Sequence, residues 1–273
     1  MFLPQGLYGV AGWPLGQSLS PLVHNTGFQV LGLPAVYLAW SIRPELLRDF
    51  VSAVRTLPIS GCSVTIPHKI AIMALLDQVD DSAAQAGAVN TLYFEQGRLC
   101  GANTDVAGFL APLAKLDLAA MSVLVLGAGG ASHAVAAGLL ARGCLNAAAT
   151  SPHDQSQFKL CERFGLKPLL WAERYARPYD LVINATPLGM SGKFAAENPY
   201  DFARCPGAGY AYDLIYNPLL TPFLKSAQTA GRECISGVRM FFSQADAQFR
   251  LWTGQGLPEE SRVALAQALG HTA

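Results

Sequence analysis

The chain has 273 residues, of which 51% are hydrophobic, and its nineteen basic and nineteen acidic residues give a formal net charge of zero. A chain of this length and apolar content can bury a sizeable core in one large or two modest domains, which excludes a disordered or fibrous protein. Because the net charge is zero, neither nucleic acid nor a membrane surface is favoured as a partner, and a small-molecule ligand is expected.

The six cysteines are scattered, without the Cys-x-x-Cys or ordered Cys/His spacing of a zinc site. We therefore expect reduced thiols in a cytoplasmic protein and no metal. The first residues include neither a basic segment nor a long apolar run, so no signal peptide is expected. Residues 118–140 carry no Asp, Glu, Lys or Arg over the length of a membrane span. The glycines at 127–130 nevertheless favour a buried strand followed by a buried helix.

Strands and helices alternate through the first part of the chain. The apolar run at 7–11 and the alternation at 36–42 predict strands, and the spacing of apolar residues at 44–57 predicts a helix. Ser20 stands before a proline and an apolar-periodic stretch, which predicts a helix N-cap. That structural explanation does not extend to Ser18.

A strand is expected at 61–66, where a proline stops it, and Lys69 follows shortly after. A lysine just past the carboxyl end of a strand stands where ligands collect in open α/β sheets, although most lysines are simply solvated. The segment 86–92 predicts a short turn followed by a strand, and the segment 101–105 predicts a polar turn. Asn and Asp often hydrogen-bond their own backbone in such turns. Helices are expected at 70–76 and 106–116, the second leading out of the first domain.

Residues 122–132, Ser-Val-Leu-Val-Leu-Gly-Ala-Gly-Gly-Ala-Ser, predict a buried strand, a glycine turn and a helix. Gly127 would let the backbone turn sharply, and Gly129 would let a pyrophosphate approach the main chain without meeting a Cβ. Small Ser132 would keep the helix close to the strand, and the first N–H groups of that helix would point at an anion. Glycine turns also join strands and helices for purely structural reasons, so the flanking strand and helix strengthen the interpretation.

The remainder of the chain again alternates strand and helix, which predicts a parallel sheet with right-handed crossovers. Gln244 lies on or beside the apolar stripe of a late helix, where a polar side chain needs a partner. The expected strands are 145–150, 180–186 and 210–215, and the expected helices are 158–164, 222–230, 240–253 and 258–269.

Eight segments in order along the chain resemble the shikimate dehydrogenase family: 17–25, 64–69 (Val-Thr-Ile-Pro-His-Lys), 86–92, 103–105, 127–132, 184–190, 212–224 and 244–254. The resemblance implies an α/β protein with an N-terminal α/β substrate domain, residues 1–105 completed by helices in 238–273. A Rossmann-type, doubly wound dinucleotide-binding domain would occupy 106–237. The implied reaction is the reversible reduction of 3-dehydroshikimate to shikimate with NADP as cofactor, in chorismate and aromatic amino acid biosynthesis.

By the same resemblance, Lys69 and Asp105 form the catalytic pair. Hydride transfer to a ketone leaves an alkoxide that must take up a proton; a lysine held by a carboxylate can donate it, and its charge stabilises the oxyanion. No metal is required, and no catalytic role is expected for His68. The implied substrate contacts are Ser18, Ser20, Thr65, Lys69, Asn90, Asp105, Tyr216 and Gln244. The implied cofactor contacts are Gly127, Ala128, Gly129, Gly130, Ala131, Ser132, Thr150, Ser151, Thr186, Leu214 and Gly237.

The chain departs from the family pattern in three places. Ser63 stands where the family usually has Asn, and Ala102 where it usually has Asp. At the end of the second strand of the dinucleotide-binding domain, expected at 145–150, NADP-using members commonly show Asn-Arg-Thr. Here residues 150–154 are Thr-Ser-Pro-His-Asp. The arginine that clamps the 2′-phosphate is therefore missing. Thr150 and Ser151 can still hydrogen-bond a phosphate, whereas Asp154 would suit a free ribose hydroxyl.

Two further hypotheses remain beside the NADP-dependent shikimate dehydrogenase. The missing arginine motivates a quinate/shikimate dehydrogenase that prefers NAD. A protein that keeps the fold as a non-catalytic dinucleotide sensor is disfavoured, because Lys69 and Asp105 are both present. The protein is expected to be a monomer or a homodimer.

Overall fold

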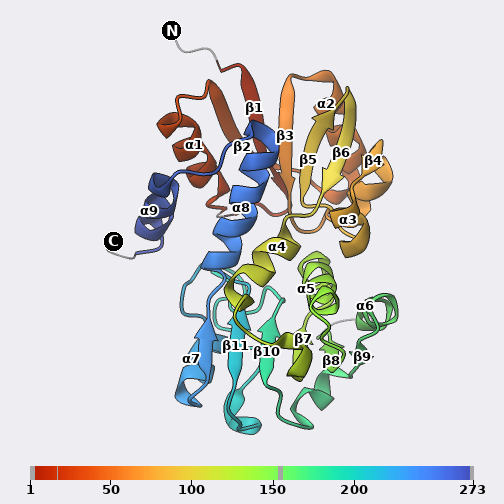
Figure 1. Cartoon of the computed structure of the whole chain (residues 1–273), viewed down its shortest axis with the longest axis vertical. Coiled ribbons are helices and arrows are strands. Elements are labelled where there is room, and N and C mark those ends of the chain that lie inside the picture. The colour runs from red at the N-terminus through yellow and green to blue at the C-terminus, as the bar shows by residue number, and fades with distance from the viewer. Residues whose placement is uncertain (1–3, 17, 153–155, 271–273) are drawn as a thin grey trace. The chain divides into compact units, whose positions relative to one another are not determined.

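The computed structural model describes residues 4–16, 18–152 and 156–270. The chain forms a first compact unit from Met1–Thr104 and Phe242–Ala273, and a second from Asp105–Phe241. Each unit is built on one six-stranded sheet with helices packed on it (Figure 1). The predicted fold class, α/β with two domains, is therefore confirmed.

The sheet of the first unit is mixed, in the order β2-β1-β3-β5-β6-β4. β1 pairs in parallel with β2 and β3, whereas β5 runs antiparallel to both β3 and β6. The strands are β1 (Gly6–Gly12), β2 (Ala35–Ser41), β3 (Ile59–Val64), β4 (Gln78–Val79), β5 (Thr91–Glu95) and β6 (Arg98–Ala102). The helices of this unit are α1 (Ser20–Val30), α2 (Leu47–Thr56), α3 (Asp81–Ala86), α9 (Glu259–Ala268) and, from Phe242 onward, α8 (Val238–Thr253).

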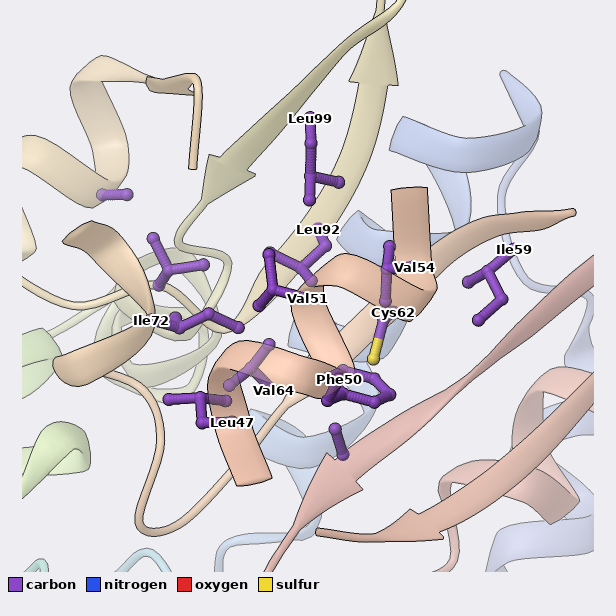
Figure 2. Packing of buried hydrophobic residues seen from close by; sticks show 13 residues of the cluster. Leu47, Phe50, Val51, Val54, Ile59, Cys62, Val64, Ile72, Leu92 and Leu99 are labelled. Atoms are coloured by element: carbon purple, nitrogen blue, oxygen red, sulfur yellow. The ribbon is translucent and has the colours of Figure 1, made fainter. Parts of the chain in front are cut away.

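One face of this sheet is covered by α2. Its buried residues Leu47, Phe50, Val51 and Val54 follow the spacing of a helical stripe, which puts them on the same side of the helix. Figure 2 shows this stripe among strand residues such as Leu92. The cluster also contains Ala11, Ile59, Cys62, Val64, Ile72, Ala83, Val89 and Leu99.

The opposite face is covered by α1 and α8. Tyr8 and Val10 of β1 pack there with Phe28 and Phe249, whereas Ala11 belongs to the α2 side. This division follows the alternation of side chains along a strand, since successive residues point to opposite faces.

The sheet of the second unit is parallel throughout, in the order β12-β11-β10-β7-β8-β9. All four residues of β7 are fully buried, as expected for a central strand covered on both faces. The strands are β7 (Val123–Leu126), β8 (Ala147–Thr150), β9 (Lys167–Pro168), β10 (Leu181–Asn184), β11 (Tyr210–Asp213) and β12 (Glu233–Ile235). The helices are α4 (Asp105–Leu110), α5 (Gly130–Ala141), α6 (Ser156–Phe164) and α7 (Pro222–Thr229).

If β7 to β12 are numbered from one to six, the strand order read from β9 to β12 is 3-2-1-4-5-6. This is the strand order of the doubly wound dinucleotide-binding fold. The chain continues from β7 to β8 on one side and later returns to β10 on the other. The strand order therefore reverses at β7, and ligands of open α/β sheets bind beside such a reversal.

Several expected elements are shorter than predicted. The helix expected at 106–116 ends at Leu110, and a 3₁₀ helix at Ala111–Leu113 follows. Pro112 has no backbone N–H and its ring would clash with the preceding turn, so it ends the regular helix. Residues 70–76 likewise form only the 3₁₀ helix Ala71–Leu75.

The strand predictions differ at their ends. β3 stops at Val64 rather than at 66, and β8 begins at Ala147 rather than at Leu145, which is 81% exposed. The polar turn predicted at 101–105 begins too early, since β6 extends to Ala102.

The remaining 3₁₀ helices are Pro44–Leu46, Leu118–Ala120, Trp171–Tyr175 and Phe202–Arg204. Over the described ranges, no helix combines the length and the apolar character needed to cross a membrane.

Candidate active site

In the first unit, predicted substrate contacts meet at the carboxyl end of β3. Thr65 follows this strand directly, and Lys69 lies on the turn beyond it. The Val89 N–H donates to the Lys69 carbonyl at 2.8 Å, and the Val64 N–H donates to the Asn90 carbonyl at 2.7 Å. The segment before β5 is therefore fixed to both the strand and the turn, which brings Asn90 to the part of the unit that carries Lys69.

The two predicted serine contacts lie at the start of α1. Ser20 is the first residue of the helix, the N-cap is Leu19, and no side chain of the cap bonds to the helix. The predicted N-cap role of Ser20 is therefore wrong. The Ser20 N–H instead donates to Ser18 Oγ at 3.3 Å, because only a residue outside the helix can accept from its first N–H groups. This bond gives Ser18 a structural role that the sequence did not suggest.

The remaining predicted substrate contacts are divided between the units. Gln244 lies on α8 within the first unit and is partly buried. Asp105 is the first residue of α4 and is buried, and the Tyr216 ring packs on Phe241 with centroids 4.2 Å apart. Both Asp105 and Tyr216 belong to the second unit.

His68 has a structural position beside Lys69. Its ring is buried, and Nε2 lies 2.7 Å from the Ile42 carbonyl. Since a carbonyl only accepts, Nε2 carries the proton and donates to it. The imidazole thereby ties the turn after β3 to the end of β2.

The two departures from the family pattern near this site are both buried. Ala102 contributes its carbonyl, which accepts the Asn90 N–H at 3.0 Å. Ser63 Oγ accepts the Tyr37 hydroxyl at 2.6 Å and donates to Gln248 Oε1 at 2.7 Å. Ser63 is thus a hydrogen-bonded link within the core.

In the second unit, four parallel strands end in register. Leu126 pairs with Thr150 on one side and with Asn184 on the other, and Asn184 pairs with Asp213. The residues that follow these strands therefore gather at one sheet edge. They include the predicted cofactor contacts Gly127, Ser151, Thr186 and Leu214.

The glycine turn has the backbone geometry that the sequence predicted. Gly127 has φ +109°, where a side chain is strained, and a Cβ there would lie 3.0 Å from the Ala185 carbonyl carbon. Gly129 is the N-cap of α5 and is exposed, and a Cβ there would meet nothing within 4 Å. The backbone at Gly129 is therefore open on the side where α5 presents its first N–H groups, from Gly130 and Ala131 onward.

Ser132 and Thr150 lie fully buried beside this turn. The Gly127 N–H donates to the Thr150 carbonyl at 2.7 Å, which fixes the turn against the end of β8. Within the described ranges, Ser132 Oγ and Thr150 Oγ1 have no hydrogen-bond partner. In this structure both hydroxyls are therefore covered by protein rather than open to a ligand at the turn. Asp154, proposed for a ribose hydroxyl, lies outside the described residues.

The loops after β10 and β11 are held by a buried carboxylate network. Asn184 Nδ2 donates to Asp213 Oδ1 at 3.0 Å, and the Thr221 hydroxyl donates to Asp213 Oδ2 at 2.6 Å. The Thr186 hydroxyl donates to Asn184 Oδ1 at 2.6 Å. Burial raises the pKa of Asp213 to about 7 even though three donors, the third being the Ile215 N–H, favour its charged form.

Gly237 approaches the loop after β11 closely. A Cβ at this position would overlap the carbonyl of Leu214, so only glycine fits against it. The Gly237 N–H also donates to the Ile215 carbonyl at 3.2 Å. The structure therefore brings the predicted contacts Leu214 and Gly237 together at the strand ends.

Four residues near these sites escaped the sequence analysis. Three of them, Asn184, Asp213 and Thr221, are polar residues at or after the ends of buried strands. Their position in the sequence was sufficient to predict that they lie near a ligand site. Gln248 is 2% exposed, whereas Gln244, one helical turn earlier, is only partly buried. Among the described residues, no group of three or more His, Cys, Asp or Glu side chains is arranged to hold a metal ion.

Residues 10–92 match the family model described as the shikimate dehydrogenase substrate binding domain. A curated relative, the shikimate dehydrogenase (NADP(+)) of Oleidesulfovibrio alaskensis, is 51% identical over 270 residues, covering 98% of this chain and 97% of the relative. The enzyme of the same name from Pelobacter propionicus is 49% identical, covering 97% of each chain.

Among solved structures, the shikimate 5-dehydrogenase of Thermus thermophilus in complex with NADP(H) and shikimate has a TM-score of 0.85 and 35% identity. The match covers 96% of this chain and 99% of that one. The two α/β units, with a glycine turn at the strand reversal of the second, are those of a two-domain dinucleotide-dependent oxidoreductase. The chain belongs to the shikimate dehydrogenase family.

Proposed function

We propose that this chain catalyses the reversible NADP-dependent reduction of 3-dehydroshikimate to shikimate, a step of chorismate and aromatic amino acid biosynthesis. The observation that carries this proposal is the position of the glycine turn in the second unit. The turn leads into the N-terminus of α5 beside β7, where the strand order reverses. The relatives named as NADP-dependent shikimate dehydrogenases, which match nearly the whole chain, support the choice of substrate and cofactor.

The second unit is the proposed dinucleotide-binding domain. The turn from Gly127 to Ser132 would hold the pyrophosphate, because the main chain is open at Gly129 and the α5 N–H groups follow it. The other proposed contacts, at the ends of the neighbouring strands, are Thr150, Ser151, Thr186, Leu214 and Gly237. The cofactor, when bound, supplies or accepts the hydride.

The first unit is the proposed substrate domain. Ser18 and Ser20 would hydrogen-bond the substrate carboxylate, helped by Tyr216. The ring hydroxyls would be read by Thr65, Lys69, Asn90, Asp105 and Gln244. Thr65, Lys69 and Asn90 are tied to one end of β3, which suits recognition of neighbouring groups on a single ring.

Lys69 is the proposed proton donor, with Asp105 as its partner. When a ketone is reduced, the alkoxide oxygen takes up a proton, and an ammonium group can provide it while its charge stabilises the oxyanion. In the oxidation of shikimate the same lysine, as the neutral amine, accepts the hydroxyl proton. The carboxylate of Asp105 would hold and orient the lysine side chain.

Steady-state oxidation of shikimate with NADP⁺ tests this proposal. Lys69→Met should lower kcat by about 100- to 10,000-fold, because it removes the proton-transfer group. Lys115→Met changes an exposed lysine of the second unit and should retain wild-type rates. A wild type without shikimate oxidation, or a Lys69→Met variant as fast as the wild type, would overturn the proposal.

The cofactor assignment has its own measurement. Comparison of kcat/KM for NADP⁺ and NAD⁺ at saturating shikimate should show a preference for NADP⁺. A large preference for NAD⁺ would instead identify the quinate/shikimate dehydrogenase alternative, which was motivated by the absence of an arginine from residues 150–154.

We infer that the enzyme works in the cytoplasm. All six cysteines are free, as expected for a reducing compartment. Its partners would be the small-molecule substrate and cofactor, and it would act as a monomer or a homodimer. Light scattering on the purified protein separates these two states, and fractionation of cells tests the compartment.

A further inference from the structure

A buried chain of hydrogen bonds crosses the first unit from β2 to the segment before β5. The Tyr37 hydroxyl donates to Ser63 Oγ at 2.6 Å, and Ser63 Oγ donates to Gln248 Oε1 at 2.7 Å. Gln248 Nε2 then donates to the Asn90 carbonyl at 3.0 Å and to Thr91 Oγ1 at 2.9 Å. All five residues are buried, with at most 6% of any one exposed.

The direction of each bond in this chain is fixed. The Asn90 carbonyl only accepts, so the Gln248 amide must turn Nε2 toward it and Oε1 toward Ser63. A hydroxyl both donates and accepts, which is what Ser63 does between Tyr37 and Gln248. Gln248 therefore has its oxygen and both of its N–H groups engaged.

Through Thr91, the same hydrogen-bond chain reaches the side-chain amide of Asn90, which Thr104 also holds. The Thr91 hydroxyl donates to Asn90 Oδ1 at 2.7 Å, and the Thr104 backbone N–H donates to that oxygen at 2.9 Å. Because a backbone N–H only donates, the atom facing it must be Oδ1. Asn90 Nδ2 lies on the other side of the amide and donates to Thr104 Oγ1 at 2.9 Å.

The far end of this series of hydrogen bonds, at Tyr37, is held by several contacts. Asn25 bonds both the N–H and the carbonyl of Tyr37, at 2.8 and 2.9 Å. The His24 ring stacks on the Tyr37 ring with centroids 4.4 Å apart and planes 9° from parallel. Burial lowers the pKa of His24 to about 3, so this ring is neutral at physiological pH. Tyr37 is therefore held through its backbone, its ring and its hydroxyl.

We propose that Gln248 is a positioning residue for substrate binding, which acts through Thr91 and the Asn90 backbone to hold the Asn90 amide in its binding orientation. This inference rests on the proposed function, in which Asn90 reads a ring hydroxyl of shikimate. Gln248 itself is only 2% exposed, so we propose that it acts through its neighbours and not by contact with the substrate.

A purely structural role, the docking of α8 on the sheet, is the alternative. The chain offers a matched comparison, because Trp252 lies one helical turn beyond Gln248 and its Nε1 donates to the Leu92 carbonyl at 2.9 Å. Both side chains thus tie α8 to the start of β5. Only the bond from Gln248 continues to Asn90.

Steady-state kinetics and thermal unfolding of Gln248→Met and Trp252→Phe separate the two roles. Methionine keeps the length of the side chain and removes all three hydrogen bonds. We expect Gln248→Met to raise KM for shikimate about tenfold, which is the effect of losing one well-placed hydrogen bond to the substrate. The KM for NADP⁺ should stay within about twofold of wild type. Trp252→Phe should lower Tm and leave both KM values within about twofold.

The Asn90→Ala background supplies the decisive control. If Gln248 acts through Asn90, adding Gln248→Met to Asn90→Ala should raise KM for shikimate by less than about twofold further. Should Gln248→Met fail to fold, Thr91→Val removes the hydroxyl that orients Asn90 Oδ1, and it must raise KM for shikimate in the same way.

The outcomes are distinct. A wild-type KM in the folded Gln248→Met variant, equal increases in Gln248→Met and Trp252→Phe, or a full additional effect in the Asn90→Ala background would overturn the inference alone. A wild-type enzyme that does not oxidise shikimate would overturn the proposed function and this inference together.

Discussion

Replacement of Asp213 by asparagine should change how the stability of the protein depends on pH. Asp213 is fully buried at the end of β11, and burial raises its pKa from an ordinary value of 3.8 to about 7. The folded state therefore holds this proton more tightly than the unfolded chain. The resulting stabilisation is fully present below the unfolded pKa and is lost as pH rises through the folded one.

The size of the effect follows from the shift. About three pKa units at 1.36 kcal/mol each correspond to a change on the order of 4 kcal/mol in the free energy of unfolding. Asparagine is similar in shape and stays neutral at every pH. Its oxygen can accept from Asn184 and Ile215 as Asp213 Oδ1 does, and its NH₂ group can donate to a reoriented Thr221 hydroxyl.

Urea denaturation of both proteins from about pH 4 to about pH 8 measures the difference. The stability of Asp213→Asn relative to wild type should rise through this range, because only the wild type loses the contribution of the proton. Other carboxyl groups, such as Asp77 and Asp180, are present in both proteins and cancel. A constant difference, or one that falls as pH rises, would refute the raised pKa of Asp213.

Two further predictions contrast the glycines of the turn. Gly127→Ala should cost about 1–3 kcal/mol of stability, because its φ of +109° is strained for alanine and the new Cβ meets Ala185; calorimetry tests this. Gly129→Ala should leave Tm near that of wild type, since its Cβ enters open space, yet raise KM for NADP⁺ about tenfold or more as the pyrophosphate meets the methyl group. Equal effects of the two substitutions on stability would contradict this interpretation.

Periodicity in the sequence was sufficient to predict the α/β class and the central strands. The strand β7, the glycine turn and α5 follow from a short local pattern of apolar and glycine residues. The ends of elements were less predictable, because they depend on local breaks such as Pro112 or on exposure such as that of Leu145. The short strands β4, β9 and β12 carry too few residues to show a period.

The candidate site shows the same limit. Ser18 and Ser20 stand out in the sequence, but which of them serves the helix start depends on where the helix begins. Gln244 and Gln248 are both polar residues on one helix, and only tertiary structure shows that Gln248 is the one buried against Asn90. The bond between Ser63 and Gln248 joins residues 185 positions apart, and local pattern carries no information about such pairs.

The most direct test of the proposed activity mixes the purified protein with NADPH and 3-dehydroshikimate. NADPH should be consumed in one-to-one proportion with ketone, and NMR should identify shikimate as the product. If NADPH is not consumed, or if the product is not shikimate, the function proposed for this chain is wrong.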